Sequence, residues 1–176
     1  MKITPVMEKF ILHWGEMGTR WGVNRTVAQI HALLYLSTKP LDAEEIAETL
    51  NVARSNVSNS LKELQGWGLV KVIHVMGDRR DHFESLNDVW DIFMVIFEER
   101  KKRELDPTLT MLRECEIDAD FDTETPKEIK TRISNTLDFI ELTTGWYDQM
   151  KGLPRPTLIK LMKFGAKVQN LLTRKR

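Results

Sequence analysis

The stretch that decides the fold is residues 40–86, PLDAEEIAETLNVARSNVSNSLKELQGWGLVKVIHVMGDRRDHFESL. Its first half has the apolar spacing of two short helices, and its second half is rich in β-branched residues, as strands are. Asp42 precedes the first helix as an N-cap, and Asn51 and Val52 supply a turn short enough to join the two helices. This order of helix, tight turn, helix and strand hairpin predicts a winged helix-turn-helix.

The second helix of this stretch has an apolar side and a polar side. At 100° per residue, Val57, Leu61 and Leu64 fall within about 60° of one another, so they form one stripe that must be buried. Serine and asparagine dominate the other sides; they are poor helix formers but suit base edges and phosphate oxygens. The predicted DNA-binding residues of this helix are Arg54, Ser55, Asn56, Ser58, Asn59 and Lys62. A merely solvated polar helix is the alternative interpretation.

A cationic tip is predicted for the hairpin. Residues 69–76 and 82–86 have strand character, and the loop between them carries Arg79 and Arg80. Such a tip can lie along phosphates or enter a narrow minor groove. We therefore expect both arginines to bind DNA beside the groove that the helix reads.

Residues 24–90 resemble the GbsR-type branch of the MarR superfamily of bacterial and archaeal transcriptional regulators. The segments that carry the resemblance are VNRTVAQIHALLYLSTKPLDAEEIAETL, NVSNSLKELQGWGLV and GDRRDHFE. The resemblance implies a homodimer that binds operator DNA through paired winged helices. Ala53 departs from the family pattern, because such proteins usually place a Ser or Thr there to cap the recognition helix. A second departure lies in the first helix of the winged domain, expected at residues 24–37, where Ala28, Gln29, His31 and Ala32 replace a more Gly- and Arg-containing pattern of the family.

The sequence outside the winged segment predicts helices with more apolar surface than one small domain can bury. Residues 3–22 have amphipathic spacing, and the helix after the wing is apolar nearly all round at its start. Pro107 is expected to limit that helix, with further helices near 109–117, 127–150 and 157–176. These unburied surfaces predict dimerisation.

The predicted fold class is mainly α with a small β-hairpin wing, a winged helix-turn-helix plus a helical dimerisation region. The expected domains are an N-terminal dimerisation helix at 1–23, the DNA-binding domain at 24–87, and a helical dimerisation and C-terminal region at 88–176.

Composition and motifs argue against several other classes of protein. No apolar run approaches the roughly 20 residues that span a bilayer, the N-terminus lacks the pattern of a signal peptide, and Cys115 has no second cysteine to pair with. A cytoplasmic protein without a membrane partner is expected. Nucleotide-binding, hydrolase and metal-ligand motifs are missing from the sequence, so we expect no enzyme activity, no cofactor and no metal.

Net charge is zero, but the charge is segregated along the chain. Residues 104–150 carry 4 basic and 12 acidic groups, whereas residues 151–176 carry 8 basic groups and no acidic one. The basic end ends in Arg174, Lys175 and Arg176. Solubilising the last helix is its simplest role; contact with phosphate and pairing with the acidic segment are the alternatives.

Three of the five tryptophans, Trp14, Trp21 and Trp90, are predicted to line a pocket for a small-molecule effector of unknown identity. The resemblance implies choline as one candidate, and aromatic rings attract quaternary ammonium groups. Packing in the core and at a dimer interface is the favoured alternative.

These observations predict a sequence-specific DNA-binding transcriptional regulator, a homodimeric repressor that reads a pseudo-palindromic operator in double-stranded DNA. The half-sites of such an operator lie about 10 base pairs apart, one helical turn. A winged-helix protein-interaction module without an operator is the alternative, because it shares the same core pattern.

Overall fold

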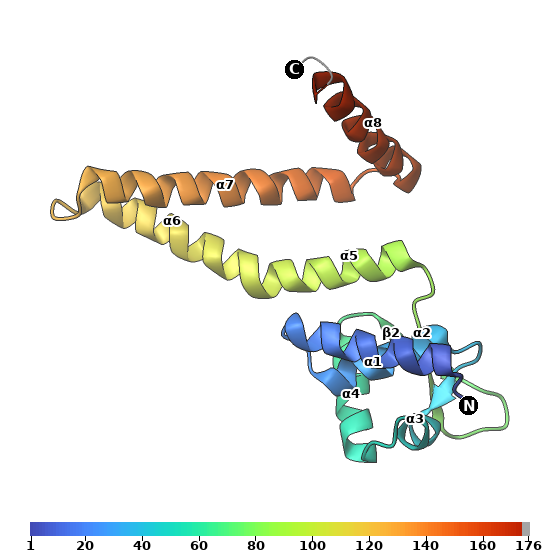
Figure 1. Cartoon of the computed structure of the whole chain (residues 1–176). Coiled ribbons are helices and arrows are strands. Elements are labelled where there is room, and N and C mark those ends of the chain that lie inside the picture. Colours follow the sequence, from blue (N-terminus) through green and yellow to red (C-terminus); the bar gives the residue numbers. More distant parts are fainter. Residues whose placement is uncertain (174–176) are drawn as a thin grey trace. The chain divides into compact units, whose positions relative to one another are not determined.

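The computed structural model describes residues 1–173, with side chains through residue 164, so the basic residues Arg174, Lys175 and Arg176 lie outside the described part. The chain divides into two compact units between residues 99 and 100. Its helices and strands are shown in Figure 1. In chain order they are α1 (Pro5–Arg20), α2 (Arg25–Leu36), β1 (Leu41–Asp42), α3 (Ala43–Leu50), α4 (Arg54–Gly66), β2 (Val70–His74), β3 (Asp81–Ser85), α5 (Val89–Arg100), the π-helix η1 (Lys101–Leu105), α6 (Asp106–Phe121), α7 (Lys127–Lys151) and α8 (Arg155–Thr173).

The first unit is a winged helix, as the sequence predicts, but its sheet has one strand more than the expected hairpin. β3 lies in the middle, with β1 on one side and β2 on the other, and both pairings are antiparallel. Leu41 of β1 and Val72 of β2 are both paired with Phe83. The two-residue strand β1 was not predicted, because two residues are too few to show an alternating pattern.

The core of this unit lies between α2, the helix-turn-helix and the sheet. Ile30, Leu33, Ile46, Val57 and Leu64 are all essentially inaccessible to solvent, and they belong to one hydrophobic cluster. The predicted apolar stripe of the second helix therefore faces inward, which fixes the direction of its polar side.

Helix α1 packs against α2 at very short range. It begins at the N-cap Thr4, whose hydroxyl accepts a hydrogen bond from the Met7 backbone N–H. Gly15 and Gly18 are buried where the two helices meet, and a Cβ built on Gly18 would lie 2.5 Å from the Cβ of Ala28. One side of α1, the predicted dimerisation helix, thus packs against α2 of the same chain. That its other side takes part in a dimer stays a prediction.

Pro107 does not end the helix that follows the wing. Residues 89–121 are helical throughout, as α5, η1 and α6 in succession. Proline lacks a backbone N–H, and its ring crowds the carbonyl four residues earlier, so an unbroken α-helix is disfavoured there. The five-residue π-helix just before Pro107 widens the turn and lets the helix continue.

The second unit is built on a hairpin of α6 and α7. Leu109, Leu112 and Leu137 form its small core, with Ile133 and Ile140 packed against them. Residues 122–126 form the short connection between these two helices. Among the described residues, no helix is both long and apolar enough to cross a bilayer.

Candidate nucleic-acid interface

Helix α3 of the helix-turn-helix has a defined cap at each end. The Asp42 carboxylate accepts from the backbone N–H groups of Glu44 and Glu45 at 2.8 and 2.9 Å, and Glu45 accepts from the Asp42 N–H at 3.2 Å. This reciprocal capping box starts α3. Asn51 ends α3 in the left-handed conformation, with φ of 52°, which asparagine tolerates better than most residues.

Helix α4 exposes the whole set of polar residues predicted to bind DNA. Val57, Leu61 and Leu64 are buried. The exposed residues are Arg54, Ser55, Asn56, Ser58, Asn59 and Lys62. Within the described part of the chain, no side-chain hydrogen bond involves the two serines, the two asparagines or Lys62, so their donors and acceptors are available to a ligand. This surface is defined below as the α4 face.

The start of α4 lacks a side-chain cap, as expected from Ala53 at its N-cap position. This residue occupies the N-cap and makes no side-chain hydrogen bond, so one cap interaction worth about 1 kcal/mol is missing. Arg54 lies next to it and pairs with Glu44 of α3 at 3.5 Å. Both side chains are more than half exposed, and such a pair adds little stability. The guanidinium of Arg54 can therefore leave Glu44 and bind a phosphate with little loss of folding free energy.

The two wing arginines lie in different surroundings. Arg79 is exposed and has no ion pair among the described residues. Arg80 instead folds back: its Nη1 lies 2.6 Å from Asp42 Oδ2, and its Nη2 lies 2.6 Å from Asp78 Oδ2. The Arg80 side chain is still 58% exposed, whereas that of Asp42 is 4% exposed. Arg80 thus braces the wing against the start of α3 and keeps part of its guanidinium at the surface.

Asp78 and Arg80 stay ionised over the ordinary pH range. Hydrogen bonds from the Arg80 side chain hold the pKa of Asp78 well below its usual value, and the Asp78 carboxylate raises the pKa of Arg80 further. His82 of β3 lies beside them, with Nε2 3.7 Å from Asp78 Oδ2 and Nδ1 3.1 Å from the Arg80 carbonyl oxygen.

Asp42 has a second role that the sequence analysis missed. It caps α3, pairs with His82 in the sheet and binds Arg80 of the wing, all from one buried position. The capping role is visible in the sequence as an Asp three residues before a Glu. The link to Arg80 has no local signal, because it joins residues that only folding brings together.

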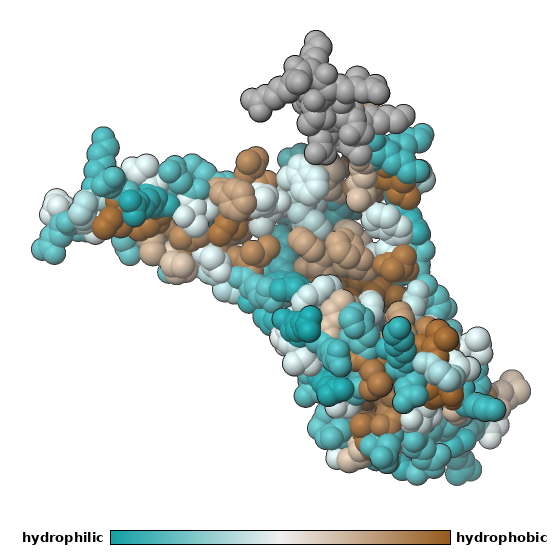
Figure 2. Space-filling model, in the orientation of Figure 1, coloured by the Kyte–Doolittle hydropathy of each residue, from teal (hydrophilic) through white to brown (hydrophobic). Residues whose placement is uncertain are grey.

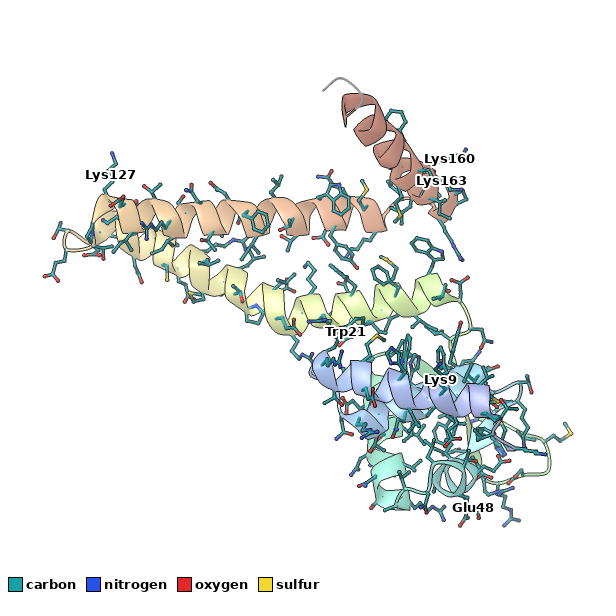
Figure 3. The ribbon with its side chains drawn as sticks, in the orientation of Figure 1. Lys9, Trp21, Glu48, Lys127, Lys160 and Lys163 are labelled. Atoms are coloured by element: carbon teal, nitrogen blue, oxygen red, sulfur yellow. The ribbon has the colours of Figure 1, made fainter. Side chains whose placement is uncertain are left out.

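The predicted tryptophan pocket is present in part. Trp14 and Trp21 line a cavity of about 50 Å³ within the first unit, together with Trp67 and His31, whereas Trp90 is not among its lining residues. Trp21 lies where α1 ends (Figure 3). His31 is 3% exposed, and its Nε2 is buried without a hydrogen-bond partner. Burial lowers the pKa of His31 from 6.5 to about 4, so the ring is neutral near pH 7.

Comparisons with known proteins agree with this geometry. The model of the MarR family matches residues 21–81. The chain is similar to the HTH-type transcriptional repressor GbsR of Bacillus subtilis (strain 168), with 24% identity over 76% of this chain and 75% of that protein. It is also similar to the putative HTH-type transcriptional regulator YvaV of the same organism, with 22% identity over 54% of each chain. A solved crystal structure of a transcriptional regulator covers 90% of this chain and 99% of its own, with a TM-score of 0.57 at 17% identity, and shows the same fold.

Proposed function

We propose that the chain is a DNA-binding transcriptional repressor of the MarR type that acts as a homodimer, because the MarR family model matches residues 21–81 and GbsR-like regulators are among the similar proteins. The observation that carries the proposal is the α4 face, where serine and asparagine side chains are exposed and make no side-chain hydrogen bond to any residue that the structure describes. A helix of this kind fits the major groove, and asparagine can bond to adenine through two atoms.

Different parts of the winged unit supply different kinds of contact in this proposal. Ser55, Asn56, Ser58 and Asn59 reach base edges and nearby phosphates, while Arg54 and Lys62 bind the backbone on either side of the helix. Arg79 binds phosphate or the minor groove from the wing. Arg80 contacts DNA only with the part of its guanidinium that the two aspartates leave exposed.

A dimer follows from the modest charge of this surface. Residues 51–80 carry five basic and two acidic groups, a surplus of three. Each neutralised phosphate adds about one unit to the salt dependence, so a single winged unit would bind weakly at physiological salt. Two units related by a two-fold axis would read a pseudo-palindrome with half-sites about 10 base pairs apart.

Substitution of Asn59 and of Arg79 is expected to have two distinguishable results. With an operator selected from genomic fragments, Asn59→Ala should cost about 1–3 kcal/mol of binding free energy and relax the preference for operator over random duplex. Arg79→Ala should weaken both duplexes equally and reduce the slope of log affinity against log salt by about one unit per subunit. Gel shifts over a salt series measure both effects.

Asn87→Ala is the matched control, because Asn87 is exposed beyond the wing and lies off the α4 face. It should bind both duplexes as wild type does. If Asn59→Ala and Arg79→Ala also behaved as wild type, neither the α4 face nor the wing would be the DNA surface. If no genomic fragment were retained at low salt, a protein-interaction module would become the better assignment.

We also propose that the cavity beside Trp14 and Trp21 holds a small-molecule effector, for which its volume of about 50 Å³ must widen on binding. Its three indole rings, those of Trp14, Trp21 and Trp67, would report a ligand through tryptophan fluorescence, and choline and glycine betaine are the first compounds to titrate. A saturable change that disappears in Trp14→Phe is the expected result. Trp90→Phe serves as the control, because Trp90 does not line this cavity. The absence of any saturable change with either compound would remove both from consideration.

A further inference from the structure

The last segment of the chain has a far larger excess of positive charge than the winged segment. Residues 151–176 carry eight basic groups and no acidic one. Residues 51–80, which include the α4 face and the wing, have a surplus of only three basic groups. Attraction for a polyanion grows with the number of cations that lie together. The last segment is therefore the most favourable place for a further contact with phosphates.

Three lysines of this segment recur on one side of α8. Lys160, Lys163 and Lys167 have the three- and four-residue spacing of a single helix side. At 100° per residue, their positions fall within about 60° of one another. With a rise of about 1.5 Å per residue, the row is about 10 Å long, and one strand of B-DNA presents about three phosphates over that length. The row thus offers about one cation for each phosphate of a strand that lies along it.

Lys160 and Lys163 have no carboxylate partner within the described part of the chain. Both are exposed, and both extend from α8 into solvent (Figure 3). Figure 2 shows hydrophilic residues on the corresponding side of α8. Lys151, at the end of α7, is by contrast paired with Asp148 at 3.2 Å. Because Lys160 and Lys163 have no such ion pair to break, they can bind phosphate oxygens without losing an interaction.

The apolar residues at the start of α8 lie on a different side of the helix. Leu161 and Met162 are 43% and 61% exposed. At 100° per residue, their mean direction is about 180° from that of the three lysines. Packing of this apolar side against another surface would therefore leave the lysines in solvent. Phosphate binding by the lysines does not compete with such packing.

We propose that the lysine side of α8 is a second phosphate-binding surface, which contacts the backbone of duplex DNA without reading its sequence. An ammonium group attracts phosphate oxygens as a point charge, and contacts to the backbone carry no direct sequence information. The surface adds the electrostatic affinity that a winged unit with a surplus of three lacks. This inference rests on the proposed function as a DNA-binding protein, but it concerns affinity for any duplex and not the preference for an operator.

Replacing two lysines in the full chain tests this surface. Lys160→Gln/Lys163→Gln should weaken binding to a random-sequence duplex about tenfold at about 50 mM salt. It should also reduce the slope of log affinity against log salt by about two units for each subunit that contacts DNA. The ratio of operator to random affinity should stay that of wild type, because both duplexes lose the same contacts. Fluorescence anisotropy of labelled duplexes over a salt series measures all three quantities.

Lys9→Gln/Lys127→Gln is the matched control. These two lysines are also exposed, on α1 and at the start of α7, so both lie outside α8 (Figure 3). The control removes the same total charge as the α8 variant. Salt screens charges that do not touch the duplex, so the control should change the affinity for random duplex by less than about twofold.

Three results would overturn the proposal. The first is a lysine variant with the affinity and salt slope of wild type, and the second is a control that weakens binding as much as the α8 variant does. The third is a change in the mass of the α8 variant in sedimentation without DNA, which would assign the lysines to a contact between subunits. If the variant lost affinity for vesicles of phosphatidylglycerol but kept its affinity for DNA, the first result would hold and the lysines would be assigned to a membrane surface.

The proposed function has a separate fate, because none of these substitutions touches α4 or the wing. A wild-type chain that never prefers an operator over random duplex would contradict operator reading. The loss of random-duplex affinity in the α8 variant would still support the lysine surface.

Discussion

Lowering the pH from 7 to 5 is expected to cost the wild-type protein about 2 kcal/mol more folding stability than it costs the His31→Phe variant. Burial lowers the pKa of His31 to about 4 in the folded chain, against 6.5 when unfolded. Between these values the unfolded chain binds a proton that the folded chain does not, so stability falls as the pH falls through that window. Urea denaturation at a series of pH values gives the two free energies.

The substitution is chosen to retain the packing of the ring. The His31 ring lies 6.3 Å from that of Trp14, and phenylalanine fills similar space without the unpartnered Nε2. At pH 7 the variant should therefore be at least as stable as wild type, because a buried polar atom without a partner is removed. The control is His13→Phe, which removes an exposed imidazole from α1 and should keep the wild-type pH profile. Parallel profiles for wild type and His31→Phe would show that His31 is not buried as described.

Gly18→Ala is expected to destabilise the first unit by about 1–3 kcal/mol, although alanine is the better helix former. The added methyl carbon would lie 2.5 Å from Ala28 Cβ, so α1 and α2 must move apart and lose part of their packing. Thermal or urea unfolding measures the loss. Combining Gly18→Ala with Ala28→Gly removes the clash, and the double variant should be more stable than the sum of the two single changes predicts.

The matched control is Gly145→Ala in the middle of α7. No atom outside the helix lies within 4 Å of a Cβ built there, so the same substitution should stabilise α7 by about 0.5–1 kcal/mol. Opposite signs at the two glycines are the expected outcome. A stabilising Gly18→Ala would mean that α1 does not lie against α2 at this distance.

The helix-turn-helix was predictable because its signals are local. A stripe at the helical period, a capping residue and a short turn each depend on neighbours in the sequence, and the structure places Val57, Leu61 and Leu64 inside as that stripe requires. The exposure of the α4 face follows from the same stripe. The strand β1 and the passage of the helix through Pro107 were missed, because one depends on pairing with β3 and the other on a π-turn.

The amino-acid sequence alone therefore determined the mainly helical class, the winged segment and the polar side of its second helix. The reason is that the spacing of apolar residues along the sequence decides which side of each helix or strand is buried. Only the tertiary structure decided that Arg79 has no ion pair within the described part of the chain while Arg80 is held by Asp42 and Asp78. It also decided that His31 is buried beside Trp14. Adjacent arginines look alike in a sequence, and the two differ here because folding brings the carboxylate of Asp42, which is distant in sequence, to Arg80.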